Sequence, residues 1–411
     1  MRWHNIQRWA CGLLGACLLM TALCSVRADG AAETLTERCS VSAPIAFNRK
    51  SAARMTDGAR ETHATLLGWT GFSVRLPAGE TARSLYMEWM EPQKKITVQE
   101  YDDAGKLLRS TQYLDSTLDC GYPLTAQTAR VRVRGGFLMK VANLALIAAD
   151  APPESERRWL PAAEKCDLLV VSAHCDDELL FFGGAIPYYA GERGYTVQVA
   201  YMAHGERMRQ GEAMDGLWLC GVRNDPVFLG FPDIYFDDQA AAEKAWGRER
   251  TLEALVSLLR RTRPEVALTH GLDGEYGHGA HRITAHCMLD AVKLAADPAA
   301  YPKSAAAYGP WQVKKLYLHV GQGDNRIVMR WDVPLAAFGG KTAIQTADDA
   351  YHMHASQLYL YSDVYNPGLN NSDFGLYATT VGPDVAKDDF FEHVPGAALT
   401  ARGEGGADGA E

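Results

Sequence analysis

From residue 165 onward, apolar strand-like runs alternate with helical segments, and this alternation constrains the fold more than any other feature. The runs CDLLVVSAH, YTVQVAYMAHG, DPVFLGF, EVALTHG and VKKLYLHVG are short and apolar, as strands buried on both faces are. Between them lie four helical stretches: LLFFGGAIPYYAGERG, RMRQGEAMDGLWLCGV, the amphipathic AWGRERTLEALVSLLRRTRP and HRITAHCMLDAVKLAA. This alternation predicts an α/β fold whose largely parallel sheet carries helices on both faces.

The region before it, from about Cys39 to Ala149, has a different pattern. Runs such as SLYMEWM, KITVQEYD, KLLRSTQYL, ARVRVRG and KVANLALIA are short, several alternate apolar with polar residues, and DDAGK suits a hairpin turn. These runs predict a smaller antiparallel β-sandwich. With MTDGARET before them, they resemble the galactose-binding, discoidin-type sandwich.

The length of 411 residues favours two domains, and the proline-rich, charged stretch ADAPPESERRWLP is the predicted linker between them. The glycine- and acid-rich end ARGEGGADGAE predicts a disordered tail. The expected division is a signal peptide at 1–28, a β-sandwich at 29–150, a linker at 151–164, a Rossmann-like α/β domain at 165–398 and a tail at 399–411.

The first residues have the three parts of a secretory signal peptide. Arg2 and Arg8 form a weakly positive head, ACGLLGACLLMTALC is a short apolar core, and SVRADG offers small residues for cleavage after Ala28. We expect a secreted or periplasmic protein, without a transmembrane segment after cleavage. An uncleaved anchor, or lipidation at Cys17 in LGAC, is the alternative.

Six cysteines remain after such a cleavage, an even number that permits disulfides in an oxidising compartment. Cys39 and Cys120 bracket the first domain and are predicted to pair, whereas the sequence leaves the pairing of the other four open: Cys166, Cys175, Cys220 and Cys287. The net charge of −9, the pI of about 5.8 and the lack of a basic block argue against a nucleic-acid partner.

Polar residues gather where two of the predicted strands end. SAHCDDE leaves the first strand and THGLDGEYGHGAH leaves the fourth, and parallel sheets bind ligands at the carboxyl ends of their strands. In these loops His174 and Asp177 are three residues apart, as are His278 and His281. Two histidines and one carboxylate make the open ligand set of a catalytic zinc ion, and a neighbouring carboxylate suits a general base. Either motif alone is more often a solvated surface.

The sequence AHCDDE followed by GEYGHGAH resembles the PIG-L/LmbE-type family of zinc-dependent N-acetylglucosaminyl deacetylases, whose motifs are AHPDDE and HxxH. RQGE, VFLGFPD and AYHMHASQ fit further family elements, so the resemblance covers about 165–395. It implies that Zn²⁺, or a similar divalent metal, is bound by three residues: His174, Asp177 and His281.

The same resemblance implies the other roles. Asp176 would be the general base and later the acid, His278 would stabilise the oxyanion, and Arg209 would contact the substrate. Glu178 would support the site or the start of the following helix. Two positions depart from the family pattern: Cys175 replaces a proline, and Ala280 stands where a polar residue often lies, which would lower activity or change its pH optimum.

The expected function is hydrolysis of the N-acetyl group of an amino sugar, with a carbohydrate as the partner. The alternatives are a glycan-binding protein whose hydrolase domain is weak or inactive, and a deacetylase acting on an O-acetyl ester or another amide. Three further histidines have either a contact near the site or a structural role: His204, His270 and His354.

Overall fold

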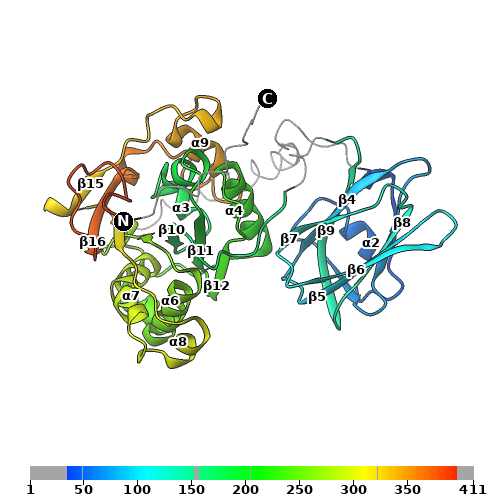
Figure 1. Ribbon diagram of the computed structural model, residues 1–411, viewed down its shortest axis with the longest axis horizontal. Helices are drawn as coiled ribbons and strands as arrows, with labels where there is room; N and C mark the ends of the chain where they lie inside the picture. The colour runs from blue at the N-terminus through cyan, green and yellow to red at the C-terminus, as the bar shows by residue number, and fades with distance from the viewer. Residues whose placement is uncertain (1–34, 49, 152–156, 204, 322, 396–411) are drawn as a thin grey trace, which may run out of the picture.

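The computed structural model describes residues 35–48, 50–151, 157–203, 205–321 and 323–395. They form an N-terminal part built of strands and a C-terminal α/β part, which lie next to each other in Figure 1. The expected signal peptide lies outside the described residues, as do the expected tail and residues 152–156 of the expected linker. Within the described ranges, every helix is too short or too polar to cross a membrane.

A seven-stranded sheet runs through the C-terminal part in the order β12-β11-β10-β13-β14-β16-β15. The strands are β10 (Leu168–Ser172), β11 (Val197–Ala203), β12 (Val227–Phe231), β13 (Val266–Thr269), β14 (Lys315–His319), β15 (Arg326–Val328) and β16 (Asp373–Thr379). The pairs from β12 to β14 are parallel, whereas β16 pairs antiparallel with both β14 and β15. The predicted α/β class is confirmed, and the antiparallel edge is a feature that the sequence pattern does not indicate.

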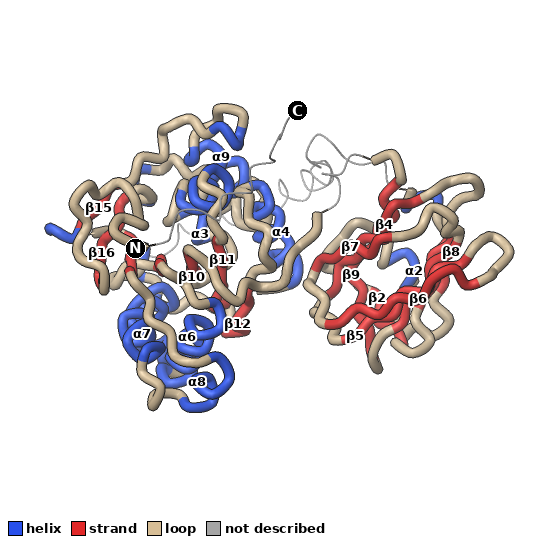
Figure 2. Tube along the Cα trace, viewed as in Figure 1, coloured by secondary structure: helices blue, strands red, loops and turns tan. Residues whose placement is uncertain are grey.

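Both faces of this sheet are buried. Leu168 and Val170 of β10 face one apolar core, and Leu169 and Val171 face the other. The first core lies under α3 (Asp177–Leu180), the π-helical turn η3 (Pro187–Glu192), α4 (Arg207–Leu219) and α9 (Ala343–Tyr351). The second lies under α5 (Gln239–Trp246), α6 (Arg248–Thr262) and α7 (Gly279–Ala296), with α8 (Pro302–Tyr308) beside α6 (Figure 2).

Two predicted helices are each divided at a glycine. The stretch 179–194 is not one helix, because Gly183 has a φ of 53° and a Cβ there would lie 2.4 Å from the carbonyl oxygen of Asn371. It forms only the end of α3 and the separate turn η3. The amphipathic stretch that ends at Pro264 divides into α5 and α6 at Gly247, whose φ is 78°.

The N-terminal part consists of two antiparallel sheets around one apolar core. One sheet has the order β1 (Ser40–Ser42), β3 (Phe72–Arg75), β8 (Arg130–Arg134), β5 (Lys95–Tyr101) and β6 (Leu107–Leu114). The other has the order β2 (Ala64–Leu67), β9 (Leu138–Ala148), β4 (Ala82–Trp89) and β7 (Asp119–Pro123), and α2 (Ser51–Arg54) precedes β2. The hairpin turn at 102–106 forms, with Gly105 at a φ of 82°.

The predicted bridge between Cys39 and Cys120 is not formed, and the six cysteines of the described ranges are all free thiols. The thiol of Cys39 donates to the carbonyl of Leu35, whereas that of Cys120 lies between Trp89 Nε1 and the Tyr122 hydroxyl. The two cysteines also precede or lie in strands of different sheets, so each thiol has its own polar neighbours.

Helix α4 is shared between the two parts of the molecule. Arg207, Gly211 and Asp215 follow one another at intervals of four residues, so they form one stripe that faces the N-terminal part. Arg60 pairs with Asp215 at 2.7 Å, and a Cβ on Gly211 would lie 2.4 Å from Cδ of Arg60. Arg207 pairs with Asp119 and donates to the carbonyl of Trp89 at 2.7 Å.

The opposite side of α4 faces the α/β part. Glu212 accepts from the backbone and hydroxyl of Ser356 at 2.9 and 2.5 Å, and a Cβ on Gly216 would lie 2.9 Å from the carbonyl of Ala350. Arg209 lies on this side too and pairs with Asp176 and Asp233. One helix therefore connects the strands of the N-terminal part with the loop that follows β10.

Candidate active site

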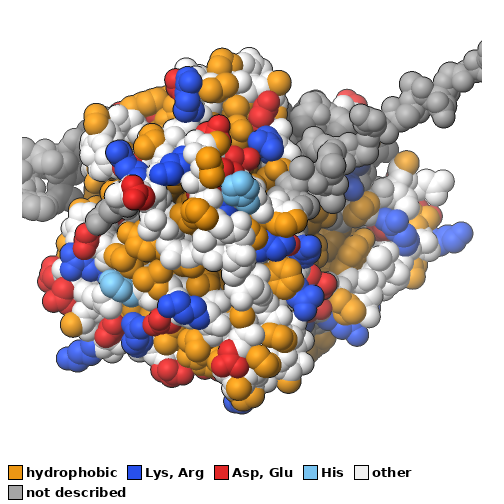
Figure 3. Space-filling view, turned by 60° about the vertical axis from the view of Figure 1, so that its left-hand side comes forward, with side chains coloured by type: hydrophobic (Ala, Val, Ile, Leu, Met, Phe, Trp, Pro, Cys, Tyr) orange, Lys and Arg blue, Asp and Glu red, His pale blue; other side chains and the backbone are white. Residues whose placement is uncertain are grey.

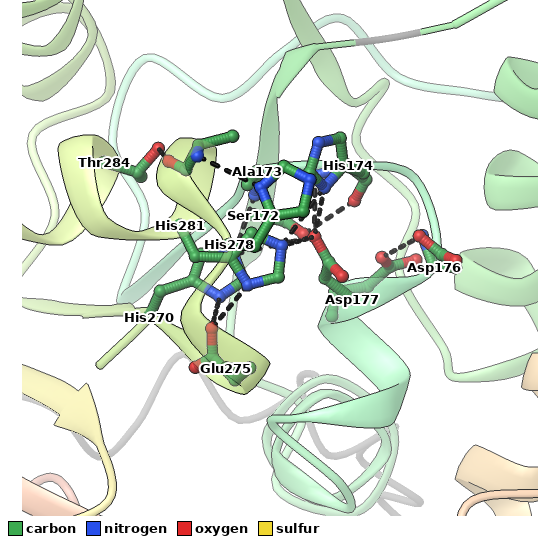
Figure 4. A network of polar contacts seen from close by, with 12 residues as sticks. Ser172, Ala173, His174, Asp176, Asp177, His270, Glu275, His278, His281 and Thr284 are labelled. Atoms are coloured by element: carbon green, nitrogen blue, oxygen red, sulfur yellow. Dashed lines mark hydrogen bonds and ion pairs between the residues drawn. The ribbon is translucent and has the colours of Figure 1, made fainter. Parts of the chain in front are cut away.

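The two polar loops meet because β10 and β13 are parallel neighbours. The loop after β10 carries His174 and Asp176 and continues into α3, which begins at Asp177. The loop after β13 carries the short turn η4 (Glu275–Gly277) and leads into α7 through His278. All of these polar side chains are buried. The histidines, Asp177 and Glu275 lie together in Figure 4, with Asp176 to one side of them.

Three donor atoms form a nearly equilateral triangle at this point. His174 Nδ1 lies 2.9 Å from Asp177 Oδ2, and His281 Nε2 lies 3.2 Å from each of these two atoms. A metal ion with tetrahedral bonds of about 2.0–2.2 Å places its ligand atoms roughly 3.3–3.6 Å apart, slightly farther than the sides of this triangle. The triangle fits such an ion, and its three atoms can hold a metal.

Electrostatics favour the charge that the triangle needs. Burial opposes ionisation of Asp177, but His281 and His174 outweigh it and hold the pKa of this carboxyl well below its ordinary value. The backbone N–H of His174 also donates to Asp177 Oδ2 at 2.8 Å. Asp177 is thus a carboxylate anion that is held by the two histidine rings and by a backbone N–H. A metal ligand has to be deprotonated in this way.

Glu275 aligns the histidines from behind. Its carboxylate accepts from Nδ1 of His281 at 2.6 Å, of His270 at 2.7 Å and of His319 at 2.7 Å. Nδ1 of His281 donates to Glu275, so Nε2 is the ring nitrogen that faces the triangle. Asp177 and Glu275 outweigh burial and raise the pKa of His281 to about 10, so a metal ion that binds at Nε2 would displace a proton from it. The sequence reasoning missed Glu275 and His319, since a single glutamate in a glycine-rich loop has no partner at a recognisable spacing.

His270 belongs to this support and not to the ligand triangle. Its Nε2 accepts the backbone N–H of Ala173 at 2.8 Å, while its Nδ1 faces Glu275. Both ring nitrogens therefore have hydrogen-bond partners. Nε2 lies near Oδ2 of Asp177, at 3.8 Å, but is not available as a metal ligand. Burial lowers the pKa of His270, in agreement with a neutral ring that ties one loop to the other.

Asp176 lies beside the triangle in a strained backbone conformation, with a φ of 151°. Its backbone N–H donates to Glu178 Oε2 at 2.9 Å, and its Oδ1 accepts from Arg209 at 3.2 Å. Burial and the neighbouring Asp177 raise the pKa of Asp176 to about 8, in spite of Arg209. A pKa in this range suits a group that gains and loses a proton near neutral pH.

His278 lies on the other side of the triangle, with ring centroids 4.8 Å from both His174 and His281. The backbone N–H of Ala280 donates to its Nδ1 at 3.1 Å, so the proton of the neutral ring lies on Nε2. Burial and the two neighbouring histidines lower the pKa of His278 to about 3. The ring is a neutral donor, whose orientation depends on the backbone of Ala280 and needs no side chain there.

Arg209 joins Asp176 to a cavity. It donates to Asp233 at 2.6 Å and to the carbonyl of Cys175 at 3.1 Å, besides Asp176. Together with Gly205 and Asp233 it lines a cavity of about 460 Å³. The side chain of Cys175 points into the apolar core, where burial raises the pKa of its thiol well above the usual range.

Glu178 and His354 lie behind the site. Glu178 accepts from the Tyr201 hydroxyl at 2.7 Å, and its Oε1 lies 3.5 Å from Nε2 of His354. Both side chains are fully buried. Their position supports the loop at Asp176 and is out of contact with the ligand triangle. Helix α9 ends at Tyr351, so most of the stretch AYHMHASQ, including His354, lies in the turn after this helix.

Tyr235 and Tyr276 flank His278, at ring-centroid distances of 4.8 and 5.8 Å. Both rings are more than half exposed, and Tyr276 has a φ of 45°. The sequence reasoning missed both, because tyrosines in loops are common. His204 lies outside the described residues.

Comparison with known proteins supports the same region. Residues 169–292 match the PIG-L family model, described as GlcNAc-PI de-N-acetylase. The chain is 32% identical over 279 residues to a 1D-myo-inositol 2-acetamido-2-deoxy-alpha-D-glucopyranoside deacetylase of Rhodococcus erythropolis, covering 53% of this chain and 92% of that protein. A Rhodococcus jostii protein of the same name is 31% identical over 199 residues, 41% of this chain and 66% of that protein.

Among solved structures, the N,N'-diacetylchitobiose deacetylase of Pyrococcus horikoshii aligns with 50% of this chain and 76% of its own, at 19% identity and a TM-score of 0.39. A family 32 carbohydrate-binding module of Clostridium perfringens NanJ aligns with 28% of this chain and 96% of its own, at 13% identity and a TM-score of 0.24. From the sequence relatives, the chain belongs to the PIG-L family of deacetylases.

Proposed function

We propose that the protein is an exported, zinc-dependent deacetylase that hydrolyses the N-acetyl group of an amino sugar. The observation that carries the proposal is the triangle of His174 Nδ1, Asp177 Oδ2 and His281 Nε2, with sides of 2.9–3.2 Å. The relatives named above, which are deacetylases of acetamido sugars by name, support the substrate class.

His174, Asp177 and His281 would hold the zinc ion. Bound there, such an ion would polarise the amide carbonyl and lower the pKa of a water molecule. Three protein ligands leave a position for these groups, whereas a structural zinc site would use four.

Asp176 then acts as the base and the acid of the reaction. It removes a proton from the attacking water, whose oxygen forms a bond to the amide carbon. When the carbon–nitrogen bond breaks, Asp176 returns the proton to the departing nitrogen, and acetate and a free amine result. Arg209 holds Oδ1 of Asp176 at 3.2 Å and so keeps the carboxyl group in place.

His278 stabilises the negative oxygen that develops on the amide carbonyl. Its Nε2–H is available for this because Nδ1 accepts from the Ala280 backbone. Alanine at position 280 therefore still permits the donor role, which favours an active enzyme over a glycan-binding protein without activity.

The test is release of acetate by the purified protein with zinc. We expect release from an N-acetylglucosamine oligomer and slower release from an O-acetylated sugar. If the protein binds zinc but releases acetate from neither substrate, the proposal is wrong. If the O-acetyl ester reacts faster, the bond is an ester and the amide assignment is wrong.

Export and the identity of the N-terminal part are also proposals. The charged head, apolar core and small-residue site before Asp29 support cleavage after Ala28. N-terminal sequencing of the mature protein, with Asp29 expected first, tests this. The two antiparallel sheets around one core support a galactose-binding-like sandwich. A binding titration of galactose to the full chain tests that assignment.

A further inference from the structure

Three arginines alternate along one strand of the N-terminal part, in a stretch that the proposed function does not use. Arg130, Arg132 and Arg134 occupy every second position of β8, and Val131 and Val133 between them are buried in the core. Because side chains alternate between the two faces of a strand, the arginines share the outer face of the five-stranded sheet. We propose that this arginine face, made by the outward side chains of β3, β8 and β5, binds an acidic polysaccharide whose charges are carboxylates.

The neighbouring strands add two cations and no carboxylate to this face. Arg75 of β3 lies directly opposite Arg130, and Lys95 begins β5, which pairs with the other edge of β8. The remaining outward side chains of the five strands are neutral. Asp103, in the hairpin turn that follows β5, pairs with Arg75 at 3.4 Å from the margin of the sheet. The face therefore carries five cationic side chains in a chain whose net charge is −9.

The guanidinium groups on β8 have few partners within the protein, although each carries five N–H donors. Among the described residues, the three groups form one hydrogen bond, from Arg132 to the carbonyl of Thr70 at 3.1 Å, and no ion pair. Nε of Arg134 is buried without a hydrogen-bond partner in the same part of the chain. Arg130 lies over the ring of Tyr101, at 4.3 Å from its centroid. Most of these donors are therefore available to a ligand.

Repulsion between the cations makes this arrangement unfavourable in the free protein. Arg75 and Arg130 lie directly opposite each other on paired strands, and like charges in such positions destabilise a sheet. Ser73 and Gln99 occupy the outward positions on either side of Arg132, so neutral side chains also fit this surface. The fold itself therefore does not require the charges, and an anionic polymer along β8 would remove their repulsion.

The arginine face is separate from the contact between the two parts of the chain. Arg207 makes that contact with Trp89 of β4 and Asp119 of β7, which belong to the four-stranded sheet. The five-stranded sheet is the other layer of the sandwich, and Figure 1 shows β8 on the side away from the α/β part. A polymer bound along β8 would leave the candidate active site open.

The chemistry of the face favours a carboxylated polysaccharide over a nucleic acid or a protein. A guanidinium group binds a carboxylate through two parallel N–H donors, and the side chains of Ser73 and Gln99 can bond sugar hydroxyls. Arg130 lies over Tyr101, the one aromatic ring among the outward strand residues, so nucleic-acid bases lack a surface on which to stack. The centre of the face also lacks the apolar side chains that a protein interface buries.

An anionic bilayer fits the face less well. Stable binding to a bilayer surface combines positive charge with apolar side chains that enter the lipid. The exposed leucines of this sheet, Leu107 and Leu114, lie on the edge strand β6, whereas the arginines are half-buried on the central strand. A flat bilayer would meet the edge strands first, but an extended polymer can lie along β8.

The test measures binding of the full chain to polygalacturonate and to the same polymer with its carboxyl groups methyl-esterified. We expect polygalacturonate to bind, with an affinity that falls about tenfold or more between about 50 and 200 mM salt. The esterified polymer should not bind. Equal binding of the two polymers would overturn the inference, because charge would then not be what the face recognises.

Three other polyanions test the assignment to a carboxylated polysaccharide: dextran sulfate, phosphatidylglycerol vesicles and oligothymidylate. At equal concentrations of negative charge, each should bind more weakly than polygalacturonate. If any of them binds as tightly, the partner is of another class and the proposal is wrong.

Variants locate the binding on β8. Arg130→Gln should weaken binding of polygalacturonate about tenfold, since it removes charged hydrogen bonds. Arg130→Lys keeps the charge without the planar donor pair and should lose affinity by less. Because Arg130→Gln also removes a like charge opposite Arg75, its melting temperature should equal or exceed that of the wild type.

Arg54→Gln is the matched control, because Arg54 is also a half-buried arginine of the N-terminal part but belongs to α2, which packs beside β2 of the other sheet. Its affinity for the polymer should equal that of the wild type. Arg134→Gln replaces Arg130→Gln if the latter does not fold. Wild-type affinity in both β8 variants would show that the polymer binds elsewhere, and the inference would be wrong.

A second copy of this acidic chain is the other occupant that the charge would permit. Sedimentation in low salt should show no self-association that Arg130→Gln abolishes. Such self-association would mean that another copy covers the arginine face, and it would overturn the inference. Acetate release is measured separately from polymer binding, so this inference and the proposed function can fail independently.

Discussion

Oε2 of Glu275 lies 2.6 Å from Nδ1 of His281, and the other nitrogen of the same ring belongs to the triangle of candidate ligands. The same carboxylate also accepts from His270 and His319. Neither oxygen of the Glu275 carboxylate belongs to the triangle, so the function of this carboxylate is to orient the three histidine rings. The outcome is a candidate ligand histidine whose ring orientation is fixed before any ion arrives.

Replacing this carboxylate should weaken the metal site without removing a ligand. We expect Glu275→Gln to lower zinc affinity by about 10- to 100-fold, measured by competition with a chelator. Glu253→Gln, at an exposed position, is the control. Unchanged zinc affinity, with only a lower melting temperature, would mean that Glu275 serves folding alone.

Replacing the proposed base and replacing a proposed metal ligand should affect turnover and zinc content differently. Asp176→Asn should keep its zinc and lose about 100- to 10,000-fold in kcat, since the base is gone and the triangle is intact. His174→Ala should lose the zinc itself. Elemental analysis of the purified variants, next to acetate release, measures both effects. An active Asp176→Asn protein would show that the base is another group.

Asp225 predicts a dependence of stability on pH. Burial, with a contribution from Asp119, raises the pKa of Asp225 to about 8 from an ordinary value of 3.8. Between these values the folded protein holds a proton that the unfolded chain has lost, so the free energy of unfolding falls as pH rises through this window. Above pH 8 the loss is complete.

Asp225→Asn should remove this loss of unfolding free energy. The unfolding free energy of the variant, relative to that of the wild type, should therefore rise by a few kcal/mol, on the order of 1.4 per pKa unit, between pH 5 and pH 9. Urea unfolding at both pH values measures it. Asp237→Asn, at an exposed position, is the control. The difference in unfolding free energy between this variant and the wild type should be the same at both pH values. An Asp225→Asn protein that tracks the wild type at both pH values would contradict the prediction.

The buried pair of Arg207 and Asp119 should matter most when only one partner is removed. Arg207 and Asp119 are 2% and 1% exposed at their side chains. Arg207→Met should cost about 3–5 kcal/mol of unfolding free energy, because it leaves a buried carboxylate unpaired. Adding Asp119→Asn should recover part of that loss. Denaturant unfolding of the two single variants and the double variant tests this, and strictly additive losses would argue against coupling.

Sequence patterns were sufficient for the parts of the site that lie close together along the chain. His174, Asp176 and Asp177 fall within four residues, and His278 and His281 bracket one helical turn, so their spacing can be interpreted directly. The order of strands and helices around them followed from the same kind of local pattern.

The remainder depends on contacts between distant residues, which spacing does not encode. His319 bonds Glu275 from 44 residues away, and Asp119 pairs with Arg207 from 88 residues away. The disulfide expected from Cys39 and Cys120 is wrong for the same reason: position in the sequence brackets a domain but does not bring two thiols together. The breaks at Gly183 and Gly247 reflect backbone conformations that helical periodicity cannot indicate.

Charged side chains of both signs are interspersed over the face that Figure 3 shows. The charges at α4 are of a different kind. Arg207 is buried and Arg60 and Asp215 are partly buried, and all three form ion pairs at the contact between the two parts of the chain.

The two-sided use of α4 restricts how this chain can change in length. Each residue of a helix advances the side chains by 100°, so inserting or deleting one residue between Arg207 and Asp215 would turn Asp215 away from Arg60. The same shift would move Glu212 away from Ser356, on the far side. Point substitutions that keep the residues of both stripes are tolerable. An insertion or a deletion within the thirteen residues of α4 is not tolerable. Descendants of this sequence should therefore vary in the loops around α4 and keep its length constant.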